Sequence, residues 1–435
     1  MSKHVEQLLD QMSLAEQVSL LAGRNMWNTV PNDRIGLEKM RVSDGPGGVR
    51  GSKFDGPASM NVPCGTAIAA SWDTALVRDI GELLGREVVA KGARVHLAPT
   101  INLHRTPVGG RNFECMSEDP YLTAITAREY VLGVQSQGVA SCIKHFVGND
   151  TEFERMTIDS QIDERTLREM YLLPFEHAVR DAQVMSIMTS YNRINGPYAA
   201  DSTWLLRDVL RGEWKFDGMV VSDWFGLHST VEGVVAGLDL EMPGPTLHRG
   251  DALVAAVERG EVSADLVRDC ARNILNLMER TGGTGVPPGP EISRTDADDM
   301  ATLRRASSSA MVLLRNESIG GTPVLPLDAR GLTSIAVLGP NASRGMVQGG
   351  GSAHVTPTRV SHPLDAISDR LGSSVRIEHS AGCNINKKLP ELDARLLQNV
   401  SLDYYRDPAE LDDANAVPAE AGTTGVFRLL WAGDP

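Results

Sequence analysis

The chain has 435 residues, of which 42% are hydrophobic and 23% charged, and 42 Lys and Arg against 56 Asp and Glu give a net charge of −14. This composition is typical of a soluble globular protein, and its acidic balance argues against binding to nucleic acids or anionic membranes, which need a basic face. The length allows two or three domains with a large core.

The N-terminus, Met1-Ser-Lys-His-Val-Glu6, is polar and leads into an amphipathic helical pattern. It has no apolar signal-peptide core, and no run in the chain approaches the length needed to span a bilayer. We therefore expect a cytoplasmic location. The five cysteines are scattered without a C-x-x-C pair, which favours buried free thiols over metal or redox sites.

Short apolar runs alternate with helical patterns from the N-terminus to residue 280. Helices are predicted over residues 73–91, 121–137, 163–182 and 201–213. The apolar runs read as strands that end at Asp44, Thr100, His145, Tyr191, Asp223 and Met242. Such alternation indicates an α/β fold with a parallel sheet. At this length we predict a TIM-like (β/α)8 barrel over residues 1–280 rather than an open sheet.

Polar side chains stand at the ends of nearly all the predicted strands. In a barrel the carboxyl ends of the strands converge on one face, where loops build the active site. Any one of these residues could instead be a helix cap or turn former, but the agreement of five strands favours a common site. The residues are Asp44, His104 with Arg105, Lys144 with His145, Tyr191 with Asn192, and Asp223.

Asp223 is the most informative of these residues. The apolar run Met219–Val221 leads directly into Ser222-Asp223-Trp224, so a buried strand would deliver one carboxylate beside an aromatic ring. A carboxylate presented in this way can act as a nucleophile or a general base. The alternative for an Asp after a strand is a helix N-cap.

The other strand-end residues suit a small polyhydroxylated ligand. A carboxylate such as Asp44 can accept hydrogen bonds from vicinal hydroxyls, Arg111, Lys144 and His145 can donate them, and Trp224 can stack on a sugar ring. No H-x-x-x-H or D-x-D spacing occurs among these residues, so we expect no metal and no other cofactor. Phosphate binding by Arg111 and Lys144 stays open, although no Gly-rich helix start accompanies them.

The pattern changes beyond residue 280. Residues 281–300 begin with a Gly- and Pro-rich stretch and read as a linker. Arg304–Leu314 is predicted to be helical, Thr333–Pro340 to be the first strand of a new α/β unit, and Val347–Ala353 to be a flexible loop without P-loop spacing. From residue 396 to 435 the chain is acidic and Ala-rich and ends as a β-rich unit begins. We therefore expect a truncated product or a fragment.

Five motifs in this order and spacing resemble glycoside hydrolase family three, with the nearest similarity to its β-glucosidases. The resemblance covers essentially residues 1–280 and continues weakly through Ile335–Pro340 and Gly349–Val355. The motifs are Asp44-Gly-Pro-Gly-Gly-Val-Arg50, Gly110-Arg-Asn-Phe-Glu114, Lys144-His-Phe146, Met188-Thr-Ser-Tyr-Asn192 and Ser222-Asp-Trp224.

The resemblance implies that Asp223 is the nucleophile of a retaining mechanism and forms a covalent glycosyl-enzyme. Retaining hydrolysis needs an ionised carboxylate below the anomeric carbon, and we expect nearby cations to keep the pKa of Asp223 low. Trp224 would form a wall of the subsite for the non-reducing sugar. The other residues implied to shape that subsite are Asp44, Arg111, Lys144, His145, Met188 and Tyr191.

The resemblance also implies a domain order and the source of the acid/base. Residues 301–395 would be a partial α/β-sandwich domain, and residues 396–435 the approach to and start of a PA14-like β-rich insertion. Val147–Arg155 contains no His, which disfavours the N-acetylglucosaminidase variant of the family. The β-glucosidases take a Glu from the second domain, beyond the insertion in PA14-containing members, so we expect the acid/base to be absent from this chain.

These observations together predict a retaining exo-β-glucosidase whose partners are small β-glycosides or oligosaccharides. Three alternatives remain: a β-xylosidase or other β-glycosidase, a catalytically impaired sugar-binding fragment, and a TIM-barrel enzyme of unrelated chemistry. The sequence does not indicate an oligomeric state.

Overall fold

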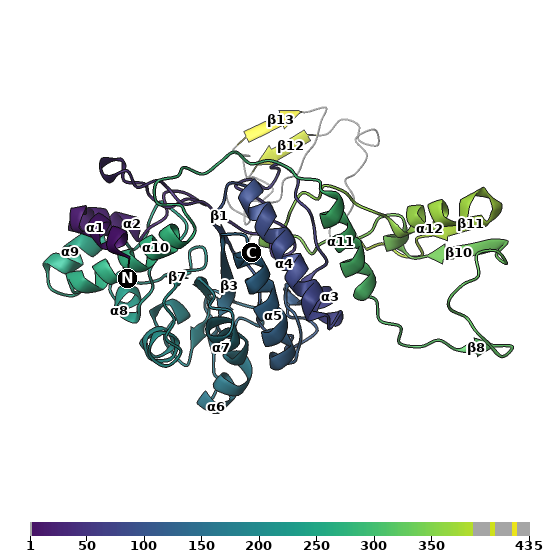
Figure 1. Cartoon of the computed structure of the whole chain (residues 1–435), viewed down its shortest axis with the longest axis horizontal. Coiled ribbons are helices and arrows are strands. Elements are labelled where there is room, and N and C mark those ends of the chain that lie inside the picture. The colour runs from purple at the N-terminus through teal and green to yellow at the C-terminus, as the bar shows by residue number, and fades with distance from the viewer. Residues whose placement is uncertain (1, 386–400, 405–419, 424–435) are drawn as a thin grey trace. The chain divides into compact units, whose positions relative to one another are not determined.

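The computed structural model describes residues 2–385 and, beyond them, the backbone of residues 401–404 and 420–423. The chain divides into two compact units (Figure 1). Unit 1 consists of residues 1–331 together with residues 345–362, and unit 2 consists of residues 332–344 and 363–435.

A parallel sheet lies at the centre of unit 1, with its strands in the order β1, β2, β3, β5, β7. The strands are β1 (Val42–Ser43), β2 (Val95–His96), β3 (Ala140–Phe146), β5 (Ser186–Thr189) and β7 (Met219–Val221). All seven residues of β3 are buried, as expected for a parallel strand covered on both faces. Isolated parallel bridges from Val221 to Leu240 and from Ala22 to Glu241 extend the curled sheet beyond β7. Strands thus form at or close to five of the six positions where the sequence predicts them, and the sixth, ending at Met242, is marked only by isolated bridges at Leu240 and Glu241.

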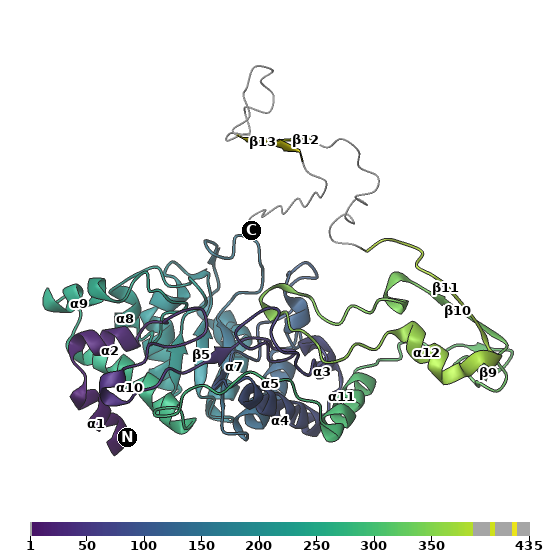
Figure 2. The ribbon, with the colours of Figure 1, turned by 90° about the horizontal axis from the view of Figure 1, so that it is seen from above.

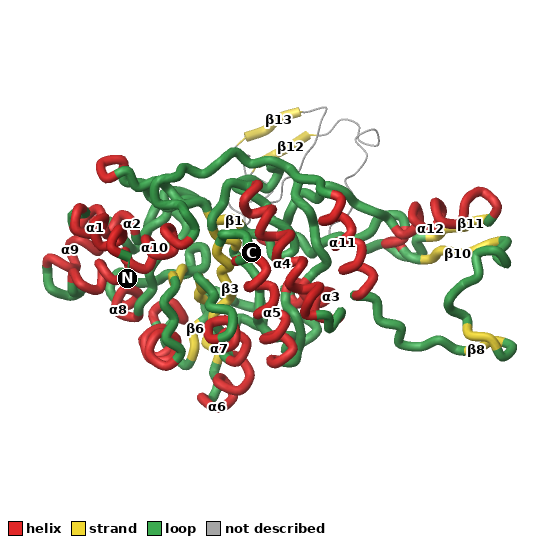
Figure 3. Tube along the Cα trace, in the orientation of Figure 1, coloured by secondary structure: helices red, strands yellow, loops and turns green. Residues whose placement is uncertain are grey.

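Helices surround this sheet (Figures 1 and 2), and Figure 3 shows the long loops that connect them to the short strands. The α-helices of unit 1 are α1 (Lys3–Gln11), α2 (Leu14–Leu20), α3 (Gly65–Ala70), α4 (Thr74–Ala90), α5 (Pro120–Gln135), α6 (Glu164–Thr166), α7 (Leu173–Arg180), α8 (Glu232–Ala236), α9 (Asp251–Glu258), α10 (Ala264–Arg280) and α11 (Ala297–Ser309). Wider π-helical turns cover Leu167–Tyr171 and Trp204–Glu213. Short 3-10 turns cover Asp33–Ile35, Asn112–Glu114, Ala199–Asp201 and Gly351–Ala353.

Local capping explains where two long helices beside the sheet, α4 and α5, begin. Asp73 accepts a hydrogen bond from the Leu76 amide at the start of α4, and Asp119 accepts one from the Leu122 amide at the start of α5, where Pro120 is the first helical residue. These side chains satisfy amides that have no partner within the helix. The helices predicted over 73–91 and 121–137 are therefore confirmed to within two residues.

Three clusters of buried apolar side chains hold the sheet and helices together. One joins α1, α2 and α10 to β1 and β7. A second is centred on Phe146, whose ring centroid lies 5.0 Å from that of Phe175 and 6.0 Å from that of Trp214. The third packs α4 against α5 and includes Ala306 of α11. Because α11 shares this third core, residues beyond the predicted linker belong to unit 1.

The helix predicted over Arg304–Leu314 is only partly correct, because α11 ends at Ser309. The four residues after Ala310 are not helical, and Met311 and Leu314 are 78% and 91% exposed. An apolar run with no core beneath it gains nothing from helical periodicity, and most helical stability in proteins comes from packing an apolar face.

In unit 2 the strand predicted within Thr333–Pro340 is confirmed. Strand β10 (Ser334–Leu338) pairs in parallel with β11 (Arg376–Ser380), and helix α12 (Pro363–Leu371) lies between them in sequence. Turns of 3-10 type follow β10 and α12 at Pro340–Ala342 and Gly372–Ser374. The backbone of β12 (Ser401–Tyr404) pairs antiparallel with β13 (Glu420–Thr423). The rest of the predicted β-rich insertion over 396–435 lies outside the described residues.

Two small strand pairs complete the secondary structure of unit 1. Strand β4 (Asp159–Ser160) pairs in parallel with β6 (Arg193–Ile194), and β8 (Ser318–Ile319) pairs antiparallel with β9 (Thr322–Pro323). In the part of the chain that the structure describes, no helix has the length and apolar character needed to cross a bilayer.

Candidate active site

Six of the eight site residues predicted from the sequence meet at one end of the sheet. Asp44 directly follows β1, Lys144 and His145 lie within β3, and Tyr191 and Asp223 each stand two residues beyond the end of β5 and β7. Arg111 reaches them from the loop after β2. This is the convergence of polar strand ends that a parallel α/β sheet produces.

Trp224 and Met188 take other positions. The Trp224 ring lies 5.5 Å from that of Trp27, and its Nε1 donates to the Met26 carbonyl at 3.0 Å, so the two indoles form an aromatic wall next to Asp223. Met188 is 1% exposed and belongs to the same apolar core cluster as Val221. Met188 therefore contributes to the apolar core.

Asp223 is nearly buried, with 7% of its surface exposed. Its Oδ1 accepts a hydrogen bond from the Trp224 amide at 2.7 Å. Its Oδ2 is buried, lies 3.5 Å from Nε2 of His145, and accepts no hydrogen bond from the described residues. A buried carboxylate oxygen without a partner is uncommon in folded proteins, and it leaves a lone pair available for chemistry.

Burial raises the pKa of Asp223, while the charges of Arg111 and Lys144, the Trp224 amide and the hydroxyl of Tyr191 oppose that shift. The expectation that neighbouring cations keep this pKa low is therefore wrong in direction. The reason is that removing the carboxylate from water disfavours its ionised form more than the two cations favour it. Burial and the Asp223 charge also raise the pKa of Tyr191, which keeps its hydroxyl protonated as a donor.

His145 is neutral in this arrangement. Burial, Arg111 and Lys144 hold the pKa of His145 well below its usual range. Its Nε2 lies 3.1 Å from Nη1 of Arg111, which can only donate, and its Nδ1 lies 3.2 Å from Oδ1 of Asn102. The proton is therefore assigned to Nδ1, and the approach of Nε2 to Asp223 is not an ion pair.

Asp44 and Lys144 form a buried ion pair with Nζ and Oδ1 2.6 Å apart. The same oxygen of Asp44 accepts a hydrogen bond from the Gly45 amide at 2.8 Å. Burial alone would raise the pKa of Asp44, but the charges of Lys144 and Arg50 and these hydrogen bonds hold it below its usual range. Asp44 is thus an ionised acceptor at neutral pH.

Glu114 orients Arg111 through a two-pronged ion pair. Nε and Nη2 of Arg111 donate to the two carboxylate oxygens of Glu114 at 2.9 Å and 2.8 Å. This fork geometry fixes the plane of the guanidinium, so that Nη1 faces His145. Glu114 therefore has a structural role at this site, as the carboxylate that orients Arg111.

The sequence analysis missed Arg50 and Arg155 as site residues. Arg50 is 3% exposed, stacks on Trp27 and Phe54 at 4.6 Å and 4.3 Å, and has no hydrogen-bond partner among the described residues for Nε and Nη2. Arg155 stacks over Tyr191 at 4.7 Å. Arg50 closes the same motif as Asp44, so its place in that motif was an available signal. Arg155 lies in the loop after β3 and carries no such signal.

The segment 345–362, from beyond the predicted linker, completes this end of unit 1. The Ser352 carbonyl accepts a hydrogen bond from Nη1 of Arg50. Gly349 lies so near the Phe113 ring that a Cβ there would overlap it. The side chain of Gln348 hydrogen-bonds both the carbonyl and the amide of Val355, at 2.7 Å and 2.9 Å. These two bonds close the Gly-rich loop and fix its shape.

Carboxylates of this site pair with cations, as in Asp44 with Lys144 and Glu114 with Arg111. Among the described residues, no group of three or more His, Cys, Asp or Glu side chains could hold a metal ion. The arrangement offers one unpartnered carboxylate oxygen, an ionised acceptor in Asp44, several fixed cationic donors and an aromatic wall. It can bind a neutral polyhydroxylated ring and present a nucleophile to it.

Comparisons with known proteins agree with this chemistry. The family description "Glycosyl hydrolase family 3 N terminal domain" matches residues 2–277, and the corresponding C-terminal domain matches residues 311–434. The chain is 49% identical over 386 residues to a beta-glucosidase of Rhizobium radiobacter, covering 88% of this chain and 47% of that protein. It is 43% identical over 396 residues to the probable beta-glucosidase J of Aspergillus fumigatus, covering 90% of this chain and 45% of that protein.

Two solved structures are similar to this chain. The beta-glucosidase from Kluyveromyces marxianus in complex with glucose superposes with a TM-score of 0.83 at 37% identity, covering 97% of this chain and 52% of that one. Beta-glucosidase 3B from Thermotoga neapolitana in complex with glucose gives a TM-score of 0.78 at 33% identity, covering 86% and 55%. The chain spans about half the length of the curated relatives it matches.

Proposed function

The chain belongs to glycosyl hydrolase family 3, and on this basis we propose that it acts as a retaining exo-β-glucosidase. Its substrates would be small β-glucosides or oligosaccharides with a terminal non-reducing β-D-glucosyl residue. The similarity to beta-glucosidases and the glucose complexes of two of them support this assignment.

The observation that carries the proposal is the unpartnered Oδ2 of Asp223. In the proposed first step this oxygen attacks the anomeric carbon, and the bond to the leaving oxygen breaks with its electron pair. A glycosyl ester of Asp223 results. Water then attacks the same carbon, and the bond from that carbon to Oδ2 breaks with its electron pair returning to the carboxylate of Asp223. The attacking water loses a proton to solvent, and glucose leaves with the β configuration retained.

The polar groups around Asp223 supply the proposed sugar subsite. Asp44 accepts from hydroxyls, while Lys144 and the free donors of Arg50 contribute hydrogen bonds to them. Nε2 of His145 is occupied by Arg111, so we propose that His145 acts mainly by holding that arginine in place. The indoles of Trp27 and Trp224 would cover the apolar face of the ring, as aromatic side chains commonly do.

Three described carboxylates in the loops around the site already have partners, which argues against each of them as the acid/base. Glu114 is paired with Arg111, Glu152 with Arg155 at 2.6 Å, and Asp150 accepts the Leu103 amide at 2.8 Å. We therefore keep the prediction that the acid/base is not among the described residues. A missing general acid lowers the rate by about 10²–10⁴-fold, and substrates with poor leaving groups are affected most.

The finer domain order is also a proposal. The bridges at Leu240 and Glu241, which extend the curled sheet, support a TIM-like barrel over 1–280. The match to the C-terminal family domain begins at residue 311, so it supports the predicted partial α/β-sandwich over 301–395 only in the part that follows α11. The linker over 281–300, the PA14-like start over 396–435 and the cytoplasmic location stay predictions.

The decisive experiment is intact mass spectrometry of the whole chain after incubation with 2,4-dinitrophenyl 2-deoxy-2-fluoro-β-glucoside. This leaving group needs no acid, so the experiment tests Asp223 alone. The expected result is a stable adduct of one sugar that maps to Asp223 and is absent from Asp223→Ala. Glucose binding by folded protein without any adduct would instead support a catalytically impaired sugar-binding protein.

A further inference from the structure

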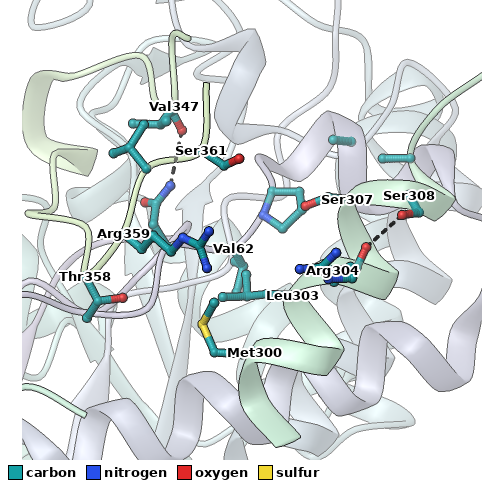
Figure 4. Close-up of a pocket in the computed structure, with 15 residues that line it drawn as sticks. Val62, Met300, Leu303, Arg304, Ser307, Ser308, Val347, Thr358, Arg359 and Ser361 are labelled. Atoms are coloured by element: carbon teal, nitrogen blue, oxygen red, sulfur yellow. Dashed lines mark hydrogen bonds between the residues drawn. The ribbon is translucent and has the colours of Figure 1, made fainter. Parts of the chain in front are cut away.

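A second concave surface of unit 1 lies beside α11. It is a groove of about 530 Å³ between α11, residues 61–63 and the segment 345–362 (Figure 4). Arg304 enters it from α11 and Arg359 enters it from the segment, and Figure 4 shows both guanidinium groups directed into the space between these elements.

The charges of these two arginines are not neutralised. Neither guanidinium forms an ion pair with a residue that the structure describes, and among the described residues no Asp or Glu lines the groove. Three carboxylates near α11 have other partners: Asp79 pairs with Arg305, Glu87 with Arg294, and Asp299 with Arg86 and Arg294. In a chain of net charge −14, an acid-free groove with two unpaired arginines attracts anions locally.

Uncharged polar groups in the groove add hydrogen-bonding capacity. The hydroxyls of Ser307, Thr358 and Ser361 line it and make no hydrogen bond to the described part of the chain. Asn61 donates through Nδ2 to the Val347 carbonyl at 3.2 Å, but its Oδ1 is buried and unpartnered. The hydroxyls and arginines can donate to an anion, whereas Oδ1 of Asn61 needs a ligand that brings a donor of its own.

Both sides of the groove are held in place before any ligand binds. The Ser59 amide donates to the Thr356 carbonyl at 2.8 Å, and the Thr358 amide donates to the Ser59 carbonyl at 3.0 Å, which fixes the backbone next to Arg359. On the other side, Leu303 of α11 packs against the third apolar cluster. A site with fixed walls loses little conformational entropy when a ligand binds.

We propose that this groove binds a small hydroxylated anion of the sugar phosphate or sugar carboxylate class. The anionic group would lie between Arg304 and Arg359, and a hydroxyl of the same ligand would donate to Asn61. The proposal does not depend on Asp223, so it stands or fails separately from the glycosidase assignment.

The test measures binding of inorganic phosphate, glucose 6-phosphate, gluconate and glucose to the whole chain by isothermal titration calorimetry. We expect both sugar anions to bind more tightly than phosphate. Substitutions in the groove should leave the binding of glucose unchanged. Arg304→Ala and Arg359→Ala should each weaken anion binding by about tenfold or more, since each removes a charge-assisted contact. Raising the ionic strength should weaken it as well.

Arg305→Ala is the matched control, because Arg305 is the next residue of α11 but pairs with Asp79. It should leave anion binding unchanged. Asn61→Ala should weaken glucose 6-phosphate and gluconate while leaving inorganic phosphate unaffected. The proposal is overturned if the anions do not bind, or if all three arginine variants have the same effect. Tighter binding of gluconate than of glucose 6-phosphate would identify a carboxylate as the preferred anionic group. Tighter binding of glucose 6-phosphate would identify a phosphate.

Discussion

Nζ of Lys144 lies 2.6 Å from Oδ1 of Asp44, and the two side chains are only 3% and 9% exposed. Removing one member of a buried ion pair leaves an uncompensated charge and costs about 3–5 kcal/mol. We therefore expect Lys144→Met to lower the free energy of unfolding of unit 1 by about that amount, as measured by urea denaturation.

The double variant Asp44→Asn/Lys144→Met provides the control for this pair. Because it removes both charges, it should regain part of the stability lost in the single variant. Additive effects of the two substitutions would show that the pair is not coupled.

The raised pKa of Asp223 predicts the pH dependence of the first chemical step. As the proposed nucleophile, Asp223 must be ionised, so kcat/KM for a dinitrophenyl β-glucoside should fall as the pH drops through this pKa, above the usual aspartate value of about 3.9. Arg111 opposes the upward shift. Arg111→Gln should therefore move the acid limb of the profile to higher pH.

Arg78→Gln is the matched control for that profile. Arg78 of α4 pairs with Glu129 of α5 at 2.6 Å and is not one of the charges that shift the pKa of Asp223. Its acid limb should coincide with that of the unsubstituted protein. A downward movement of the limb in Arg111→Gln would contradict the assignment of Arg111 as a cation that stabilises ionised Asp223.

Asp150 predicts a pH-dependent change in stability. Burial raises the pKa of Asp150 to about 6, against the Leu103 amide and Arg105, which lower it. Between about pH 4 and 6 the folded state holds a proton that the unfolded state has released, so stability falls as the pH rises and levels off above 6. Asp150→Asn should remove this fall and be more stable than the unsubstituted protein by about 1–3 kcal/mol at pH 7.5.

The same comparison at pH 4 supplies the internal control for Asp150. There the carboxyl is protonated in the folded state, so the difference between the two proteins in urea denaturation should be small. An equal difference in the free energy of unfolding at pH 4 and at pH 7.5 would mean that the substitution acts through packing and not through ionisation.

Gln348 predicts a link between the Gly-rich loop and ligand binding. Gln348→Ala removes the two hydrogen bonds to Val355, each contributing about 1 kcal/mol, and frees the loop that carries the partner of Arg50. We expect glucose affinity to fall by about tenfold, measured by calorimetry. Gln161→Ala should have no effect, because Gln161 is exposed and its side chain donates a hydrogen bond to the neighbouring Asp159.

The sequence predicted the sheet and most of the site because both depend on local pattern. A short apolar run that ends on a polar residue marks the end of a buried strand, and parallel strands bring those ends together regardless of their distance in sequence. Lys144 and Asp44 meet for this reason. The N-cap residues Asp73 and Asp119 likewise fix the start of their helices by local hydrogen bonds.

Other features depend on tertiary contacts that have no local signal. The protonation of His145 is decided by Arg111 on one side and Asn102 on the other, and the pKa of Asp223 is decided by how completely it is buried. The helix predicted to Leu314 ends early because nothing packs against its last residues. The return of residues 345–362 to unit 1 depends on pairing with Ser59, and a Gly-rich loop carries no information about its partner.

The hydrogen bond between Arg50 and the Ser352 carbonyl joins residues that are 302 positions apart. At a synthesis rate of about 5–20 residues per second, Ser352 is made about 15–60 s after Arg50. During that interval the apolar clusters around β1 to β7 can form on the ribosome, but one wall around Arg50 is still missing. A sugar that binds against this wall could therefore assist maturation only after Ser352 has been made, when the residues of the three apolar clusters have already been synthesised.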